Sequence, residues 1–337
     1  METVPSRIIK QIIIIIILGI VGFLIFYELL PYLSGFLGAI TLYILFKKPM
    51  EKLKAKGWNS SLAASLLMFL SFIGILIPVF GITLMLSNKI ENAASNAEKL
   101  FSALQQYLIK FEDTFGHDFY KDLDVTGGTS WVGENAKVLI GSTFELFVAI
   151  AIMYFLLYFM LTKPKQVKES IYNYAPFSEK HLKILVKESS KMIRSNALGI
   201  PIVALSQGIV ALIGFLIFGI ENPLFWFVIV VIGSMIPFVG TLVGVIPVFL
   251  ITLASGNDYA AYGILIYGLV VVGSTDNIIR LYVLKKMDNV HPLITLIGVI
   301  IGIPLFGFIG LVFGPITISL FFIILKMYKI EYVDKRF

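Results

Sequence analysis

The chain has 337 residues, of which 58% are hydrophobic and 14% are charged, and its formal net charge at pH 7 is +6. Soluble domains usually carry about 25% charged residues, so this composition excludes an ordinary soluble protein and predicts an all-α polytopic membrane protein. Cysteine is absent, which excludes a disulfide framework, a thiolate nucleophile and a Cys-ligated metal. The excess of Lys and Arg does not indicate a nucleic-acid partner, because cytoplasmic loops of membrane proteins are enriched in both.

Eight apolar runs follow one another along the chain. About 20 helical residues cross the hydrocarbon core, so most of these runs have the length of one crossing. The first run is too long for a cleaved signal peptide and lacks a small-residue cleavage site, which indicates a retained membrane helix. The runs cover residues 8–30, 31–46, 60–87, 138–162, 197–219, 223–254, 259–279 and 292–328.

Two polar inserts separate these runs into groups. The insert 88–137 is rich in Asp and Glu and has apolar residues at helical spacing, which predicts an extracytoplasmic amphipathic helix. The insert 163–196 is rich in Lys, which predicts a cytoplasmic amphipathic helix with Ser178 as its N-cap. Either insert could pack on its own protein, lie at the membrane interface or bind a partner. The division that follows is 1–87 for the N-terminal membrane helices, 88–137, 138–162 for one membrane helix, 163–196, and 197–337 for a C-terminal membrane core.

Two similar helix breakers interrupt the two longest runs. The stretch 236–247 reads IPFVGTLVGVIP and the stretch 303–315 reads IPLFGFIGLVFGP. Pro lacks an N–H and Gly costs about 1 kcal/mol in a helix interior, so both stretches predict helical hairpins with these residues at their tips. The breaker residues are Pro237, Gly240, Gly244, Pro247, Pro304, Gly307, Gly310 and Pro315.

Charge gives the orientation of these hairpins. The loop 47–57 contains five Lys, so it is expected in the cytoplasm together with both termini. The basic residues that follow 223–254 and 292–328 then lie inside only if each of these segments makes an even number of passes. An even number of passes is compatible both with a re-entrant hairpin and with two short crossings. The legs are short for full spans, which favours hairpins, although the leg 307–328 is long enough to cross.

The sequence has few of the residue patterns that enzymes need. The three histidines are His117, His181 and His291, and the first two fall in inserts predicted on opposite sides of the membrane. No phosphate-binding glycine loop, nucleophile motif or metal-ligand spacing occurs in the sequence. We therefore expect no enzyme activity, no cofactor and no bound metal.

Polar residues within apolar sequence are the strongest pointers to a site, because burying them is costly. The stretch GSTDNIIR at 273–280 brings four of them together, and Arg280 follows Asp276 by one helical turn. The Asp276–Arg280 pair could cap and anchor the helix end. Alternatively, Asp276 and Asn277 could line a substrate or proton path beside the hairpins. The candidates in this stretch are Ser274, Thr275, Asp276, Asn277 and Arg280.

Three further polar residues lie inside predicted membrane helices. Ser206 and Gln207 interrupt the run 197–219, and a Gln at membrane depth must bond either another helix or a solute. Glu145 lies in the outer part of the run 138–162, where it could be solvated at the rim or carry a proton. Broken helices also expose N–H and C=O groups that transporters use to hold polar or anionic solutes, although the breakers could merely allow close packing.

The stretch 276–293, DNIIRLYVLKKMDNVHPL, followed by PLFGFIGLVFGP at 304–315, is similar to the C-terminal signature of the autoinducer-2 exporter family of bacterial membrane proteins. IPFVGTLVGVIP and the order of runs and inserts also fit this family. One departure is Leu281, where the family pattern leads us to expect Pro, so a kink there is in doubt. The resemblance implies about eight transmembrane segments, a bacterial inner-membrane location and a homo-oligomer.

Three functions are compatible with these features. The first is a secondary active transporter that exports a small polar or signalling solute by alternating access, with 197–337 as its transport core. The second is a Na⁺(Li⁺)/H⁺ antiporter in which Asp276 or Glu145 carries the proton. The third is a non-transporting membrane scaffold whose inserts bind partners.

Overall fold

The computed structural model describes residues 6–77, 80–81, 143–174, 178–236, 240–275, 278–279 and 292–329. All regular structure in these ranges is helical, without a strand. Within them, five helices are long and apolar enough to cross a membrane, or six if one bent pair counts as a span. The prediction of an all-helical, multi-pass membrane protein is therefore confirmed, whereas eight spans stay a prediction. The insert 88–137 lies outside the described residues.

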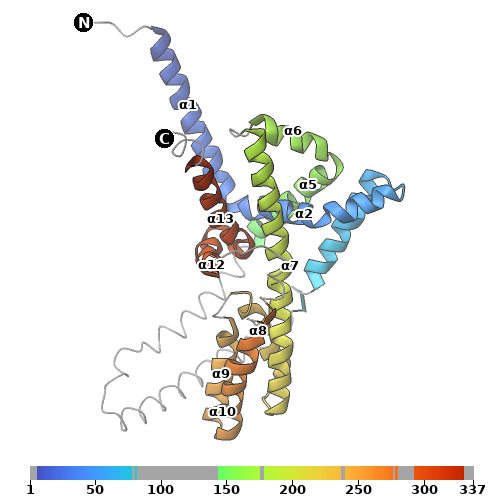
Figure 1. Cartoon of the computed structure of the whole chain (residues 1–337), viewed down its shortest axis with the longest axis vertical. Coiled ribbons are helices and arrows are strands. Elements are labelled where there is room, and N and C mark those ends of the chain that lie inside the picture. The colour runs from blue at the N-terminus through green and yellow to red at the C-terminus, as the bar shows by residue number, and fades with distance from the viewer. Residues whose placement is uncertain are drawn as a thin grey trace, which may run out of the picture.

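The N-terminal helix α1, Ser6–Leu29, stands apart from the other helices (Figure 1). Its side chains are exposed from Lys10 to Leu29, including the isoleucine run from Ile12 to Ile17. Such a surface requires an apolar environment, so α1 fits a lipid-facing span. The short 3₁₀ helix η1, Leu30–Tyr32, follows, and Figure 1 shows α2 running in a different direction from α1.

Helix α2, Leu33–Ala55, continues through residues that were expected to form a loop. The reason is local, because Lys, Glu, Met and Leu are good helix formers. Packing adds to this preference, since Met50 is buried and Leu53 packs beside it in one apolar cluster. The positively charged segment after residue 46 is therefore the last part of a helix.

Helix α2, the helix Ser60–Ile77 and α5, Thr143–Thr162, form the N-terminal group. Gly35 and Gly38 of α2 face Ala149 and Met153 of α5, so the two backbones approach closely. These helices share an apolar cluster, and polar groups from two of them also meet: the hydroxyls of Ser71 and Tyr154 lie 3.2 Å apart. The cluster contains Ala39, Met50, Ala63, Ala64, Leu67, Leu157 and Leu161.

Helix α6, Pro164–Tyr174, leads to α7, Glu179–Ile217, the longest helix described. The hydroxyl of Ser178 accepts a hydrogen bond from the N–H of His181 at 3.4 Å, which confirms the predicted N-cap. The 39 residues of α7 extend about 58 Å, and the helix passes without a break from the Lys-rich insert into apolar sequence.

Three short helical segments pack beside the second half of α7, as Figure 1 shows. Helices α8, Pro223–Gly233, and α9, Gly240–Ala254, follow it in the chain. Helix α10, Asp258–Tyr267, continues directly into the π-helix η2, Gly268–Val272. We call α8, α9, α10–η2 and the second half of α7 the α7–α10 unit.

The last two helices, α12, Pro292–Phe306, and α13, Gly310–Tyr328, run antiparallel to each other. Gly298 faces Gly314 and Pro315, whereas Gly302 faces Gly310, so their backbones touch along a glycine seam. The 3₁₀ helix η3, Gly307–Ile309, reverses the chain, and Gly307 adopts a left-handed φ of 62° that favours glycine.

The glycine seam gives a stability prediction. A Cβ at Gly302 would overlap the backbone of Gly310, so Gly302→Ala is expected to destabilise the protein by about 1–3 kcal/mol. The matched control is Gly74→Ala in the helix Ser60–Ile77, because a Cβ there meets open space. Thermal unfolding of the detergent-solubilised protein measures both. Equal melting temperatures for Gly302→Ala and wild type would show that the seam does not hold α12 against α13.

Candidate functional site

The packing of α8 on α7 shows which residues of the two helices lie side by side. Gly208 of α7 faces the side chains of Phe227 and Val231 of α8. The two helices are joined by a short turn after Phe218, so they run antiparallel. Residues of α7 just before Gly208 therefore lie level with the turn that follows α8.

The α9 and α10 helices follow the same antiparallel arrangement. Gly240 at the start of α9 contacts the backbone of Gly233 at the end of α8, and Gly244 contacts Val230. Gly268 of η2 faces Val245 of α9. The turn between α8 and α9 therefore lies at the end of the unit where η2 finishes.

Tyr267 connects α10 to α7 at the middle of the unit. Its hydroxyl donates a hydrogen bond to the carbonyl oxygen of Val210 at 3.0 Å, while its ring lies against Gly214. Residues that follow Tyr267 therefore approach the part of α7 that precedes Val210.

An apolar cluster fills the centre of the unit, and polar residues follow it at one end. Gln207 lies one helical turn before Ala211 of the cluster, and Ser234 lies one turn after Val230. Ser274 follows Val272 by two residues. Because the helices alternate in direction, all three positions fall at the same end. We call Gln207, Ser234, Ser274 and the start of α9 the polar level. The cluster itself consists of Ala211, Phe215, Ile220, Val230, Val248, Ile264 and Val272.

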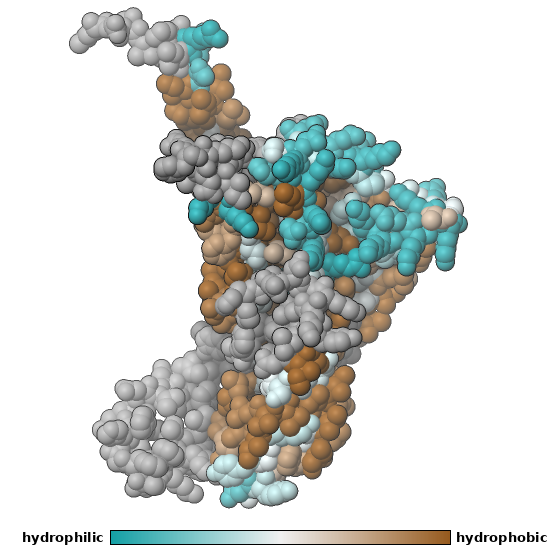
Figure 2. All heavy atoms as spheres, viewed as in Figure 1, coloured by the Kyte–Doolittle hydropathy of each residue, from teal (hydrophilic) through white to brown (hydrophobic). Residues whose placement is uncertain are grey.

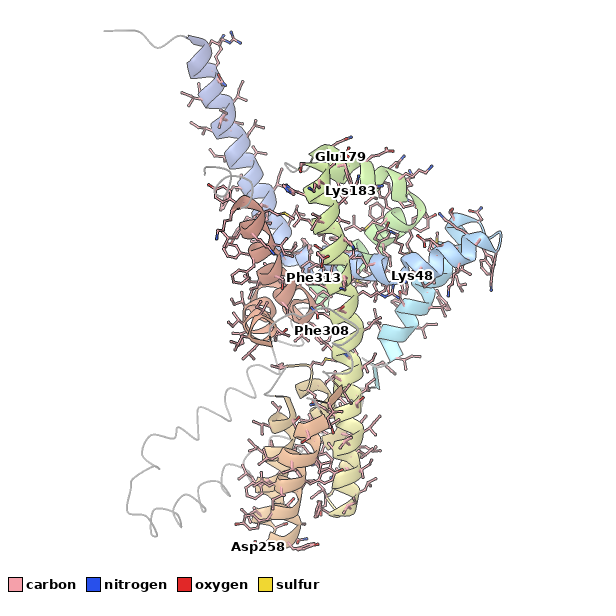
Figure 3. All side chains as sticks on the ribbon, viewed as in Figure 1. Lys48, Glu179, Lys183, Asp258, Phe308 and Phe313 are labelled. Atoms are coloured by element: carbon pink, nitrogen blue, oxygen red, sulfur yellow. The ribbon has the colours of Figure 1, made fainter. Side chains whose placement is uncertain are left out.

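The polar level lies well inside the apolar length of the unit. Its far end carries Glu221 and Asp258, and Figure 3 shows Asp258 at the extremity of the molecule. From that end, α8 reaches about 16 Å and α9 about 22 Å, compared with a hydrocarbon core of about 30 Å. The polar level therefore lies about 16–22 Å along the unit from the end that carries Glu221 and Asp258.

Ser234 is the most unusual residue of the polar level. It is 4% exposed, and its Oγ is the one buried side-chain polar atom among the described residues that has no hydrogen-bond partner. Buried polar groups are nearly always bonded, so an unbonded hydroxyl indicates a role that packing alone does not explain. Sequence analysis missed Ser234, although a serine next to a breaker in an apolar run was a detectable signal.

Gln207, which the sequence analysis singled out, is also buried. It is 2% exposed and lies on the same face of α7 as Val203 and Ala211, which are buried too. Its primary amide provides two donors and an acceptor, so it can bond either a neighbouring helix or a polar solute.

The π-helix η2 changes the direction of the residues after it. A π-helical turn inserts an extra residue, which rotates the following side chains by about 100° relative to an unbroken α-helix. Thr275 donates its hydroxyl to the carbonyl oxygen of Val271 at 2.8 Å, so it satisfies a carbonyl of this irregular turn. Insertions of this kind occur frequently at functional sites.

The structure does not bring the other predicted residues together with Gln207 and Ser234. Ser206 donates its hydroxyl to Ile202 of its own helix at 2.8 Å, so its bond is internal to α7. Glu145 lies in α5, outside the α7–α10 unit. Asp276, Asn277 and Arg280 lie outside the described residues, but Asp276 directly follows Thr275 in the chain.

The breaker residues take different places. Gly240 and Gly310 begin α9 and α13, and Gly307 forms the turn between α12 and α13. Gly244 is a contact glycine inside α9. Pro237 lies outside the described residues. Three prolines fall within helices rather than at turns: Pro247 in α9, Pro304 in α12 and Pro315 in α13.

No group of His, Asp and Glu side chains in the described part of the chain is arranged to hold a metal ion. The described side chains of the polar level are neutral hydrogen-bonding groups. Chemically, such groups can donate hydrogen bonds to a polar solute and accept them from it.

Comparison with known proteins decides the family. The sequence model of the family described as "AI-2E family transporter" matches residues 13–330, which is nearly the whole chain. The chain belongs to the AI-2E transporter family. The resemblance to autoinducer-2 exporters in the sequence is thereby confirmed.

Several curated proteins are similar to this AI-2E family member. "Putative transport protein" of Aquifex aeolicus is 23% identical over 59% of this chain and 57% of its own length. "Putative transport protein BU123" of Buchnera aphidicola is 26% identical over 94% of this chain and 91% of its own length. "Putative transport protein YrrI" of Bacillus subtilis is 24% identical over 60% of this chain, which spans 56% of that protein. The chain thus matches little more than half of the length of two of these relatives.

Ser234 gives a second stability prediction. Leaving a buried hydroxyl unbonded costs about 1–3 kcal/mol, so Ser234→Ala is expected to keep or raise the melting temperature. The control is Ser189→Ala, which removes a hydroxyl bonded to the carbonyl oxygen of Leu185 at 2.6 Å. A melting temperature of Ser234→Ala several degrees below wild type would mean that its hydroxyl has a structural bond.

Proposed function

We propose that this AI-2E family member is a secondary active transporter that exports a small polar solute by alternating access. The observation that carries the proposal is the polar level, where Gln207 and the unbonded hydroxyl of Ser234 lie beside a helix break inside an apolar unit. Transporters bind solutes near the bilayer midplane at interrupted helices of this kind.

The two antiparallel helix pairs would act as the gates. The α8–α9 turn lies level with Gln207, whereas α13 packs on α7 near Ile193. The amide of Asn196 also donates a hydrogen bond to the carbonyl oxygen of Val312 at 3.3 Å. Asn196 and Gln207 are separated by about 16 Å along α7, so the two pairs meet one helix at two levels.

Each pair would enter and return on one side of the membrane, α8–α9 from outside and α12–α13 from the cytoplasm. Support comes from their antiparallel contacts and from the short lengths of α8 and α9, 11 and 15 residues. Movement of α13 against α7 at Asn196 would then open the path to one side. Movement of the α8–α9 turn would open it to the other.

The polar level would bind the solute through neutral hydrogen bonds. Gln207 and Ser234 would contact it directly, while Ser274, Asp276 and Asn277 would complete the path and Arg280 would balance the charge of Asp276. The support for Asp276 and Asn277 is their place in the sequence, because they follow η2 by a few residues.

The alternative is a Na⁺(Li⁺)/H⁺ antiporter, in which Asp276 would carry the proton. It shares the helix arrangement and differs in the transported species. Na⁺-dependent collapse of a pH gradient in proteoliposomes without added organic solute would favour it. The scaffold alternative predicts no flux of either kind.

The location we propose is the bacterial inner membrane, with both termini in the cytoplasm. The Lys-rich ends of α2 and α6–α7 support this orientation, because Lys and Arg are enriched in cytoplasmic segments. A homo-oligomer is also proposed, as the resemblance to the family implies.

Transport measurements test the proposal. The solute is identified by comparing metabolites exported by knockout and overexpressing cells, and its flux is then measured in proteoliposomes. Asp276→Asn and Gln207→Leu are each expected to reduce flux at least tenfold while folded yield stays unchanged, because each removes a polar contact at the site.

The matched control is Asp258→Asn, at the opposite end of the α7–α10 unit. It changes the same functional group and is expected to keep wild-type flux. Full activity of both site variants would refute the assigned residues, and a wild-type protein with no flux in either assay would refute transport.

A further inference from the structure

Helix α6 is oriented differently from the helix before it. Residues 147–162 of α5 and 164–173 of α6 meet at an angle of 98°. Pro164 causes the break, because proline lacks an N–H and disfavours the helical conformation in the residue before it. The 20 residues of α5 are about the length of one membrane crossing. If α5 crosses the membrane, a helix bent by about a right angle at its end would lie along the membrane surface.

The side chains of α6 form one apolar face and one polar face, as a helix at a membrane surface requires. Val167 and Ile171 are one turn apart on one face, and Ile171 is 44% exposed although it is a large apolar residue. Glu169 and Asn173 occupy the opposite face by helical spacing. Among the described helices, the main contact of α6 is with α5, and Val167 is half-buried while Ile171 is exposed.

Two lysines lie near the apolar face. Lys163 is at the break just before α6, where its carbonyl oxygen accepts a hydrogen bond from the N–H of Val167 at 3.3 Å, and Lys168 follows Val167 within the helix. The ammonium of Lys163 is 5.3 Å from the ring centroid of Phe159, and that of Lys168 is 5.6 Å from the ring centroid of Tyr172. Aromatic rings and lysines placed side by side are typical of the membrane interface, where the ammonium reaches the headgroups.

The charge around α6 also selects the type of lipid. Residues 163–194 contain eight Lys and Arg against three Glu. Figure 2 shows hydrophilic side chains gathered over α6, the start of α7 and the end of α2. Basic segments at a membrane surface attract anionic lipids, and this attraction decreases within a Debye length.

We propose that α6 is an interfacial helix that binds anionic phospholipid headgroups through Lys163 and Lys168, with Val167 and Ile171 inserted among the acyl chains. The inference does not depend on the transported solute or on the transport mechanism. The partner is the bilayer itself, and its anionic component stabilises the folded protein.

Spin labelling tests the orientation of α6, since a chain without native cysteine accepts single labels. In liposomes with phosphatidylglycerol, a nitroxide at Ile171→Cys should collide with oxygen, which concentrates in lipid. One at Asn173→Cys should collide with a water-soluble nickel chelate. Protection of position 171 from both reagents would indicate a protein partner and overturn the proposal, as would equal exposure of both positions to the chelate.

Lipid-dependent stability tests the headgroup contact. Adding short-chain phosphatidylglycerol to the detergent-solubilised protein is expected to raise its melting temperature more than phosphatidylcholine does. The double variant Lys163→Gln/Lys168→Gln should lose at least half of this difference. The control Lys326→Gln/Lys329→Gln, at the end of α13, should keep it. An unchanged difference in the α6 variant, or no difference in wild type, would overturn the proposal.

Discussion

The close approach of helix backbones at glycine is the constraint on which the rest of this structure depends. Inside a bilayer, apolar side chains gain little by leaving lipid for protein, so helices associate mainly through van der Waals packing and polar bonds. Gly233 and Gly240 bring α8 against α9, and Gly302 and Gly310 bring α12 against α13. These contacts allow pairs of short helices to turn within apolar sequence, where an isolated helix of 11 residues would not span the hydrocarbon core.

The turn between α8 and α9 determines where polar chemistry can occur. A break in a membrane helix exposes backbone groups that only protein or a polar cavity can satisfy. The α7–α10 unit places an apolar cluster on one side of this break and Gln207 and Ser234 beside it. The π-helix η2 then directs the residues that follow Val272. The proposed solute site thus combines apolar packing on one side with the unbonded hydroxyl of Ser234 and the amide of Gln207 on the other.

Sequence patterns predicted the parts of the structure that depend on local chemistry. Ser178 was identified as a cap because a serine before an apolar helical stripe has few other roles, and Gln207 stood out because it interrupts an apolar run. The extension of α2 to Ala55 was missed because charge suggested a loop, while helix propensity and the burial of Met50 decided the outcome.

Other features could not be predicted because they depend on tertiary contacts. A valine-rich segment such as 268–272 carries no sequence signal for a π-helix, which forms here while Gly268 packs against Val245. The unbonded state of Ser234 also depends on which groups surround it. The prediction that Pro247 and Pro315 lie at hairpin tips was also wrong, because both residues lie inside helices.

The accessibility of a single cysteine at position 234 tests most directly whether the polar level receives solute. Ser234→Cys adds a thiol of similar size to a chain without native cysteine. If solute reaches this level, a charged, membrane-impermeant thiol reagent should modify the cysteine in liposomes, and saturating solute should slow that reaction severalfold. Modification only by a lipid-soluble maleimide, at a rate that solute does not change while transport proceeds, would contradict a solute path beside the α8–α9 turn.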